Sequence, residues 1–360
     1  MAVRTYAVGD AEVGKFWNKR LAREALKQTV IAPYVRDDGN AMCEVRSDTQ
    51  KGGGDRVTYT LRTQLSGDGV GENETQEGNE ESISTFTDQL VINELSHATR
   101  SNRTISQQRV PFDLAREMND GLSDWWANRM EVAAFNQLCG NTAVTSQKFT
   151  GWNATTAPTS GRYISALAAG TTDQTLTSTN VFSLTMIDQA KEVAETGGSS
   201  GLVPIRPIKG LPAGAKYVLF LHPTQVTTLR TSTSTNGWMD IQKALLSGSK
   251  SDDSMIFKGG LGVWNEVLLV SANRVTQGVN STTSAAISTV RRAVFCGAQA
   301  LQLGFGKGFG MEEWKVEEEL FDYKRQYGVS GLCIFGMKKP VFNSSDFATI
   351  VLPSYAANAA

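Results

Sequence analysis

Residues 111–140, PFDLAREMNDGLSDWWANRMEVAAFNQLCG, form the stretch on which the rest of the fold depends. Apolar side chains recur in it at every fourth position without a break: Leu114, Met118, Leu122, Trp126, Met130, Ala134 and Leu138. In a helix of 3.6 residues per turn, such a row advances about 40° around the rod at each step. The spacing therefore predicts one helix, about 40 Å long, whose winding apolar row is covered by different neighbours along its length.

Both ends of this stretch carry residues that are typical of helix boundaries. Pro111 suits a first helical position, and the acidic Asp113 and Glu117 lie near the positive end of the helix dipole. Gly140, followed by Asn141, offers a stop. We expect a central helix around which other elements pack; the alternative is an ordinary core helix of a mixed domain.

The composition is that of a globular protein, and it limits the possible partners. The chain has 360 residues, 40% hydrophobic and 20% charged, enough for two or more cores. Its 35 basic and 36 acidic residues leave no basic excess to neutralise phosphates, which disfavours tight binding of nucleic acid. Since the first residues lack the apolar core of a signal peptide and no run of about 18 apolar residues could span a bilayer, we expect a cytoplasmic product with no membrane partner.

The four cysteines, Cys43, Cys139, Cys296 and Cys333, are far apart in the sequence and form no C-x-x-C pair. The chain has only two histidines, so a cysteine–histidine zinc set has no support either. Buried free thiols are the expected state, and we predict no metal and no cofactor.

Residues 10–29 have the pattern of a basic amphipathic helix, with Phe16, Trp17 and Leu21 on one face and lysines and arginines on the other. Such a helix can lie on a membrane surface. Because no second anchoring signal accompanies it, packing along another subunit or domain is the favoured interpretation.

Two extended runs lie between this segment and the central helix. Residues 57–65, VTYTLRTQL, alternate between apolar and polar side chains, and a second run extends from Ile83 to about Ala98. The residues between the runs, 66–82, hold six carboxylates and no Lys or Arg. We predict a two-stranded arm with an acidic tip, which needs another copy of the chain to lie on. A calcium loop is the alternative, but the acidic residues lack the regular spacing it requires.

The charges of this region suggest how the arm docks. We expect the acidic tip to contact a basic surface of a neighbouring subunit, formed by cations that cluster around the base of the arm and the approach to the central helix. The tip residues are Asp68, Glu72, Glu74, Glu77, Glu80 and Glu81. The candidate basic residues are Lys51, Arg56, Arg62, Arg100, Arg103 and Arg109.

The second half of the chain mixes helices and strands irregularly, which favours an α+β fold over a doubly wound sheet. Residues 141–180 are rich in Thr, Ser, Ala and Gly, and we expect a long loop held at Trp152 and Tyr163. The further predicted elements are a helix over 184–194 that stops at Gly197, a buried strand over 217–221, a helix from Pro223, and strands over 263–270 and 293–303.

The glycine-rich segment 304–310, GFGKGFG, resembles a phosphate-binding loop. In the Walker form of that loop, Lys is followed by Ser or Thr, whereas Lys307 is followed by Gly308. The next segment is strongly acidic and would repel a polyphosphate. A turn between strands is the favoured interpretation, and a nucleotide-binding enzyme using this loop is the alternative function.

No other set of residues predicts catalysis. Glu317, Glu318, Glu319 and Asp322 could supply paired carboxylates, but a solvated or ion-paired face is more common. His97 falls in a predicted strand, and His222 precedes Pro223, where capping a helix is a sufficient role. We therefore expect no catalytic residues and a protein that is not an enzyme.

Several blocks together carry a family resemblance: GDRVTYTLRTQLSGDGV from residue 54, the central helix, YVLFLHPTQ from 217, IFKGGLGVWNEVLLV from 256 and DYKRQYGVSGLCIFGMKKPVF from 322. Their order resembles that of major capsid proteins of tailed bacteriophages, specifically the phage N-four-like capsid family, over about residues 10–345. The resemblance implies the Hong Kong 97-type capsid fold. Carried over by blocks, it implies an N-terminal arm (1–50), an E-loop (51–100), a peripheral domain with a spine helix (101–175), an axial domain (176–312) and a return to the peripheral domain (313–360).

The same resemblance implies a structural function. The chain is expected to assemble with itself into hexamers and pentamers of an icosahedral shell around double-stranded DNA, in the virion after assembly in the host cytoplasm. Because only about 50 residues precede the E-loop, the resemblance implies a separate scaffolding protein, together with a portal protein and, as an optional partner, a decoration protein. The near-neutral net charge suggests weak and non-specific contact with packaged DNA.

Overall fold

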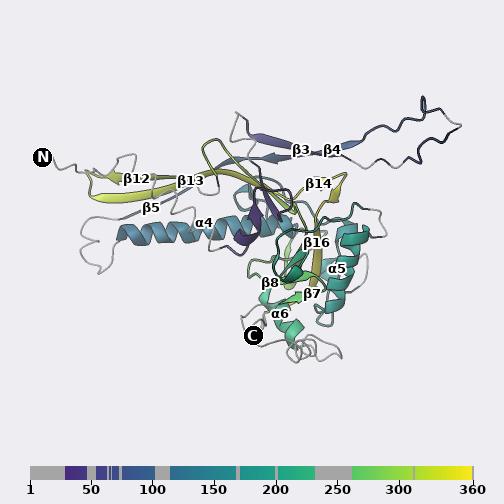
Figure 1. Cartoon of the computed structure of the whole chain (residues 1–360). Helices are drawn as coiled ribbons and strands as arrows, with labels where there is room; N and C mark the ends of the chain where they lie inside the picture. Colours follow the sequence, from purple (N-terminus) through teal and green to yellow (C-terminus); the bar gives the residue numbers. More distant parts are fainter. Residues whose placement is uncertain are drawn as a thin grey trace.

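The computed structural model describes residues 29–46, 54–62, 65, 67–72, 75–101, 114–167, 171–198, 202–231, 262–310 and 313–358. Two β-sheets meet near one end of a long helix, and a two-stranded arm projects away from that junction (Figure 1). We call the two sheets, their helices and the connecting loops the body. Apart from Thr29, the helix that the sequence predicts over residues 10–29 lies outside the described residues.

The first sheet, which we call the long sheet, is built around one 13-residue strand, β13. Both β12 and β5 run antiparallel to it and pair with its residues 328–332, so they lie on its opposite edges. β11 continues along the same edge as β12, and β2 pairs in parallel with β11. The pairing runs from β1 (Val35–Arg36) through β2 (Cys43–Arg46) and β11 (Leu301–Phe305) to β13 (Gln326–Lys338), whose one edge is completed by β12 (Lys315–Phe321) and whose other edge carries β5 (Asn93–Arg100).

Helix α4 (Leu114–Leu138) lies along the long sheet and contacts β13 and β5. Residues 133–138 are all buried, whereas Leu114 and Met118 are only partly covered. The winding apolar row is therefore confirmed, but burial on all sides holds only for the C-terminal part of the helix. The predicted stop is also confirmed, because Gly140 has φ +63° and an added Cβ would lie 2.7 Å from the Thr156 carbonyl oxygen.

The second sheet, which we call the compact sheet, lies beside helix α5 (Leu184–Thr196), which contacts β16, and helix α6 (Pro223–Thr231) follows β6 along the chain (Figure 1). All five residues of β6 are buried, as predicted for residues 217–221, and β6 pairs in parallel with β8. Gly197 ends α5, as the sequence predicts, and adopts the left-handed conformation. The strand order is β16 (Thr349–Tyr355), β10 (Ala286–Cys296), β6 (Tyr217–Leu221), β8 (Val267–Ser271) and β7 (Val263–Trp264), with β9 (Gln277–Val279) paired to β10.

One continuous hydrophobic core joins α4 to both sheets. Phe135 of α4 packs edge-on against Phe220 of β6, with ring centroids 5.4 Å apart. Trp126, which precedes Phe135 in α4, packs against Trp314 and against Phe335 of β13. The helix therefore supports the long sheet along its length and the compact sheet at its C-terminal end. The predicted α+β class is confirmed.

Three runs that the sequence predicts as single strands each contain two. Residues 263–270 form a hairpin of β7 and β8, because Asn265 and Glu266 adopt φ +45° and +63°, as a two-residue hairpin turn requires. Residues 293–303 change sheets, since β10 ends at Cys296 and β11 begins at Leu301.

The third such run, residues 83–98, divides between the arm and the long sheet. β4 (Thr85–Val91) pairs with β3 (Arg56–Arg62), as the predicted arm requires, whereas β5 pairs with β13. Ile92 separates the two strands, and its N–H donates to the Asp55 carbonyl oxygen at 2.9 Å. Only the first part of this run belongs to the arm.

Sheet membership also differs from the domain ranges that the resemblance implies. β16 lies in the compact sheet with β6 and β10, although residues 313–360 were assigned to the other domain. β5 and β11 lie in the long sheet, although their residues fall in the ranges of the E-loop and the axial domain. The chain crosses between the two sheets more often than a division by sequence blocks allows.

The long loop expected over 141–180 contains only 3₁₀ turns among its described residues, and both aromatic residues hold it as predicted. Trp152 packs against the core, and Tyr163 forms a bridge with Val351 of β16. The short elements of the structure are η1 (Ala32–Tyr34), η2 (Gln147–Phe149), η3 (Ser160–Arg162), η4 (Asp173–Thr175), η5 (Pro212–Gly214), β14 (Val341–Phe342) and β15 (Ser345–Asp346).

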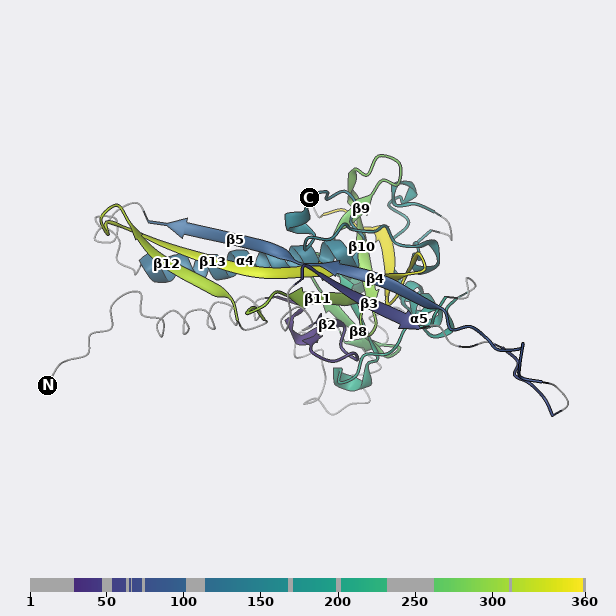
Figure 2. The ribbon, with the colours of Figure 1, turned by 90° about the horizontal axis from the view of Figure 1, so that it is seen from above.

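The arm consists of β3, β4 and the described residues between them. In the described structure its two strands pair only with each other. Seen from above, the arm extends from one end of the body while β5, β12 and β13 extend from the other (Figure 2).

Candidate assembly surfaces

Asn153 fastens the base of the arm to the body. Its Oδ1 accepts the N–H of Val91 at 2.9 Å, while its Nδ2 donates to the carbonyl oxygens of Val91 and Met337 at 2.9 and 3.0 Å. The residue is buried, so these hydrogen bonds are shielded from water. Because Val91 ends β4 and Met337 belongs to β13, this one amide fixes the point at which the arm leaves the long sheet.

Asp88 forms a second anchor, on β4. Its Oδ2 accepts the Tyr59 hydroxyl at 2.9 Å and the N–H of Val341 at 3.1 Å, and Oδ1 is paired with Lys338. Burial raises the pKa of the Tyr59 hydroxyl, and the Asp88 carboxylate raises it further, so Tyr59 remains a hydrogen-bond donor. Neither Asp88 nor Asn153 was predicted from the sequence, because nothing local marks which polar residues meet at a junction.

The outer part of the arm is exposed. Leu65 and Ile83, which flank the tip, are 56% and 60% exposed. The described carboxylates of the tip, Asp68, Glu72, Glu77, Glu80 and Glu81, are all exposed, whereas Glu74 lies outside the described residues. Two of them order the loop itself, since Glu81 accepts the N–H of Gly67 at 2.7 Å and Glu80 accepts that of Gly78 at 2.8 Å.

Of the six candidate basic residues, the three that the structure describes do not lie together within one subunit, and whether they form a docking surface for a neighbouring copy stays a prediction. Arg56 and Arg62 lie at opposite ends of β3, and Arg100 lies at the far end of β5. Because β4 leads into β5, the 15 steps along the chain from Thr85 to Arg100 extend over roughly 50 Å at about 3.3 Å per residue. Arg100 also stacks over Phe321, 4.2 Å from the ring centroid. The remaining candidates, Lys51, Arg103 and Arg109, lie outside the described residues.

The far end of the long sheet offers a second exposed surface. The hairpin between β12 and β13 turns through Asp322, Tyr323 and Lys324, which all have positive φ. Tyr323 is 99% exposed, and the nearby Leu320 is 37% exposed. This hairpin was not predicted from the sequence, because the carboxylates of residues 317–322 indicated only an acidic face.

The glycine-rich segment 304–310 lacks the geometry of a phosphate loop. β11 ends inside it at Phe305, and Gly306 donates its N–H to the Ile334 carbonyl oxygen of β13 at 3.0 Å. The next described element is strand β12, whereas a phosphate cradle leads into a helix whose N-terminal N–H groups face the anion. The segment is a turn between strands, as the sequence favours.

The other residues considered for catalysis occupy structural positions. On β12, Glu317 pairs with Lys315 at 3.2 Å, and in the following turn Asp322 pairs with Arg325 at 3.7 Å. His97 lies on β5 and stacks on Trp125 of α4, with ring centroids 4.1 Å apart.

His222 caps α6, as predicted. Its Nδ1 accepts the N–H of Thr224 at 3.3 Å and contacts the Thr224 hydroxyl at 2.7 Å. Burial lowers the pKa of His222 to about 4, with a smaller contribution from the positive charge of Arg291. The neutral imidazole that results is the form that can accept the capping hydrogen bond.

All four cysteines are buried free thiols, as predicted. Within the part of the chain that the structure describes, no three His, Cys, Asp or Glu side chains are grouped to hold a metal ion. Across those same residues, every helix is too short or too polar to cross a bilayer.

Comparison with known proteins identifies the family. Residues 5–358 match the family described as phage capsid protein. A curated relative, the major capsid protein of Pseudomonas phage KPP25, is 27% identical, and the match covers 93% of each chain. The capsid of Ralstonia phage GP4 is similar over the whole of both chains, with 26% identity and a TM-score of 0.77. The capsid of Cyanophage Pam1, 16% identical over 93% of this chain and 94% of that chain, has the same fold, with a TM-score of 0.72.

Proposed function

The chain belongs to the phage capsid protein family and is a major capsid protein of a tailed bacteriophage, and we propose that its arm is the element through which each copy holds the next in the shell. Its fold is of the Hong Kong 97 type. The observation that supports the proposal is the contrast between the anchored base of the arm and its outer part, which lacks a sheet partner in the described structure.

The physical argument starts from the size of the arm. An isolated two-stranded hairpin is marginally stable in water, and the apolar cluster under this one contains only Val57, Tyr59, Leu90 and Phe342 as buried members. Beyond Arg62 and Thr85 the chain continues outward with Leu65 and Ile83 exposed. A neighbouring copy can cover these side chains, and identical subunits related by rotation repeat the contact around a closed ring.

We further propose that the subunits form hexamers and pentamers of an icosahedral shell that encloses double-stranded DNA. In this proposal, the arm with its exposed tip is the E-loop, the long sheet with α4 is the core of the peripheral domain, and the compact sheet is the core of the axial domain. Their boundaries follow sheet membership, so β16 belongs with the axial part and β5 and β11 with the peripheral part.

The partners and location proposed here follow from the structural role. A separate scaffolding protein, a portal protein and an optional decoration protein would join a shell assembled in the host cytoplasm, and the subunit would contact packaged DNA weakly because its net charge is −1. We propose no catalytic activity. The nucleotide-binding alternative has no support from the 304–310 turn, which leads into a strand.

The proposal is tested by shortening the arm. Replacing residues 63–84 by Asn-Gly would join Arg62 to Thr85, which already face each other in register, through a two-residue turn. The base anchors at Asp88 and Asn153 stay intact. We expect a folded subunit with an unchanged melting temperature that forms no closed shells in electron micrographs.

A matched control keeps the length of the arm but replaces residues 65–84 by a Gly/Ser sequence. It should also fail to assemble if specific side chains, and not length, make the contact. Normal shells from the Asn-Gly variant would show that the arm is dispensable and would overturn the proposal.

A further inference from the structure

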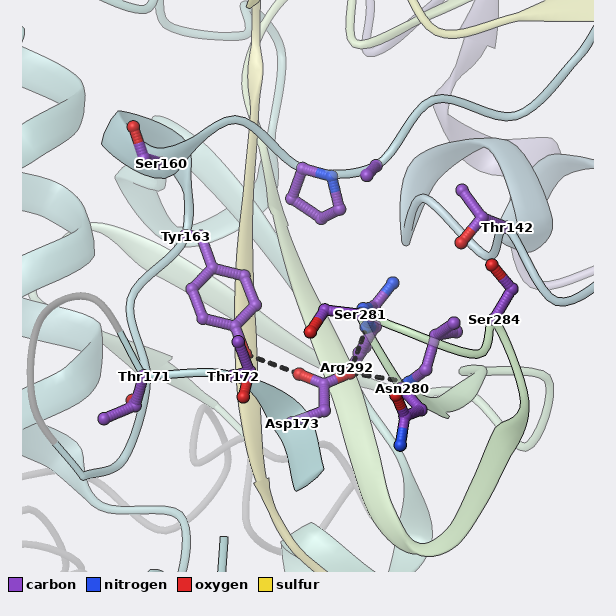
Figure 3. A pocket seen from close by; sticks show the side chains of 13 residues that line it. Thr142, Ser160, Tyr163, Thr171, Thr172, Asp173, Asn280, Ser281, Ser284 and Arg292 are labelled. Atoms are coloured by element: carbon purple, nitrogen blue, oxygen red, sulfur yellow. Dashed lines mark hydrogen bonds and ion pairs between the residues drawn. The ribbon is translucent and has the colours of Figure 1, made fainter. Parts of the chain in front are cut away.

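A pocket of about 320 Å³ opens between the long loop after α4 and the loop that joins β9 to β10. Figure 3 shows Tyr163, Asp173 and Arg292 converging in it, with hydroxyl-bearing residues of both loops around them. None of its lining residues belongs to the arm. Its volume is in the range of small-molecule sites in proteins.

A buried ion pair forms the floor of the pocket. Arg292 Nε lies 2.6 Å from Asp173 Oδ2, which also accepts the N–H of Val279 at 2.7 Å, and the Tyr163 hydroxyl donates to Asp173 Oδ1 at 2.5 Å. Arg292 Nη1 donates to the carbonyl oxygens of Cys139 and Gly140, at 3.3 and 2.7 Å. These bonds hold the floor rigid and attach it to the C-terminal end of α4.

One N–H donor of Arg292 has no hydrogen-bond partner in the described structure. Arg292 is 6% exposed, lines the pocket, and its Nη2 has no hydrogen-bond partner among the described residues. Asn280, on the rim, uses Oδ1 to accept the N–H groups of Thr282 and Thr283, but its Nδ2 has no partner in the described chain. The side-chain hydroxyls of Thr142, Ser160, Thr172 and Ser284 are likewise without a protein partner in the described structure. The pocket therefore presents two N–H donors and several groups that can donate or accept.

The charge of the lining selects the class of ligand. Among the described residues that line the pocket, Arg292 and Asp173 alone are charged, and they neutralise each other. An anion would approach Asp173 as closely as Arg292, so a neutral ligand rich in oxygen acceptors is favoured. Ala157, Pro158, Val279 and the ring of Tyr163 supply an apolar wall for part of it.

We propose that this pocket binds a neutral saccharide unit, best one that carries an acetamido group. The acetamido carbonyl accepts from Arg292 Nη2 and its methyl group lies on the apolar wall, while the ring hydroxyls exchange hydrogen bonds with Asn280 and the Ser and Thr side chains. With a neutral monosaccharide, binding should be weak, with a Kd on the order of 1 mM.

Two variants test the site without disturbing the buried ion pair. Asn280→Asp keeps the oxygen that orders the loop but removes the donor and adds a negative charge. Ala157→Tyr fills the pocket from an exposed position, where a larger side chain can be accommodated. Thr283→Ala is the matched control, because Thr283 lies in the same loop and does not line the pocket.

The probes are N-acetylglucosamine, glucose and glucuronate, titrated into the purified full-length subunit by calorimetry and saturation-transfer NMR. We expect affinity in that order, a loss of about tenfold for Asn280→Asp, no detectable binding for Ala157→Tyr and no change for Thr283→Ala. Absence of saturable binding up to about 50 mM N-acetylglucosamine, tighter binding of glucuronate, or equal binding by all variants would each overturn the proposal.

Discussion

The body and the arm place their charged residues in opposite ways. In the body, Lys339 and Asp346 form an ion pair at 2.7 Å with both side chains fully buried, and Arg292 pairs with an equally buried Asp173. Along the outer arm, every described carboxylate is exposed, and the tip contains no Lys or Arg.

The difference separates folding from assembly. A buried ion pair requires that both partners and their hydrogen bonds be in place, so it belongs to a region whose conformation the chain itself determines. Exposed charges on a two-stranded ribbon contribute little to its own stability and remain available to another molecule. Damage to the body should therefore prevent folding, whereas changes in the arm should leave the subunit folded and alter only its association.

The largest effect is expected from a charge placed in the body. Leu122 of α4 is 2% exposed within the core that includes Trp126 and Leu95 of β5. Leu122→Asp removes this packing and buries a carboxylate without a partner, so it should cost more than about 4 kcal/mol and give insoluble protein. Solubility and thermal unfolding measure the effect.

The control for this substitution lies two residues away on the same helix. Asp124 is exposed, and Asp124→Ala should change the free energy of unfolding by no more than about 0.5 kcal/mol. Soluble Leu122→Asp protein with a normal melting temperature would show that α4 does not support the body, and the comparison between body and arm would fail.

A smaller effect is expected from acid, which acts on the body through His222. Its pKa is about 4 in the folded protein against 6.5 in the unfolded chain, so between these values only the unfolded chain binds the proton. The contribution of neutral His222 to the free energy of unfolding is present in full above pH 6.5 and is lost as the pH falls toward 4. This loss is on the order of 3 kcal/mol at most. Melting temperatures across this range measure the loss.

The matched variant is His222→Asn, which keeps a side chain able to cap α6 and has no titrating group. Its melting temperature should fall less than that of the parent protein between pH 6.5 and 4, although other groups titrate in both proteins. Parallel losses in the two proteins would assign the acid sensitivity to other residues.

The features predicted correctly from the sequence are those that local physics determines. The row from Leu114 to Leu138 identifies α4, the buried run Tyr217–Leu221 identifies β6, and Gly140 and Gly197 end their helices. Each depends on periodicity or on a backbone conformation that one residue type favours. The acidic tip was found for a similar reason, since a run of carboxylates without cations is visible in the sequence itself.

The errors arise where distant pairing decides the outcome. No glycine or proline interrupts residues 83–98, so no turn residue marks the point at which β4, paired with β3, gives way to β5, paired with β13. A similar change follows β10, which ends at Cys296 in the compact sheet, before β11 begins in the long sheet. The candidate basic residues were expected to lie together because they are near one another in sequence, but the described ones, Arg56, Arg62 and Arg100, lie at different strand ends because extended strands carry sequence neighbours far apart. The pocket was missed because Asp173 and Arg292 are separated by more than 100 residues.

The smallest effect per contact is expected at the tip of the arm, and there it should appear only in assembly. Glu80 and Glu81 accept backbone N–H groups of the loop, so a test of charge alone should leave them unchanged. Asp68, Glu72 and Glu77 are exposed and have no such role in the described structure. Changing these three to their amides and, separately, to Lys gives a series in which the tip loses three and then six units of negative charge.

Each exposed ion pair contributes about 0 to 1 kcal/mol, but a shell repeats the contact in every subunit. We expect both variants to melt like the parent and to assemble progressively less well in light scattering and electron micrographs. Salt should weaken assembly of the parent most, because the screening length falls from about 10 Å at 0.1 M to about 3 Å at 1 M. Charge reversal at Arg56 or Arg62 should restore some assembly of the Lys variant if either is the docking partner. If the Lys variant forms normal shells with the salt dependence of the parent, apolar contacts through Leu65 and Ile83 or backbone pairing hold the arm, and the carboxylates serve only solubility.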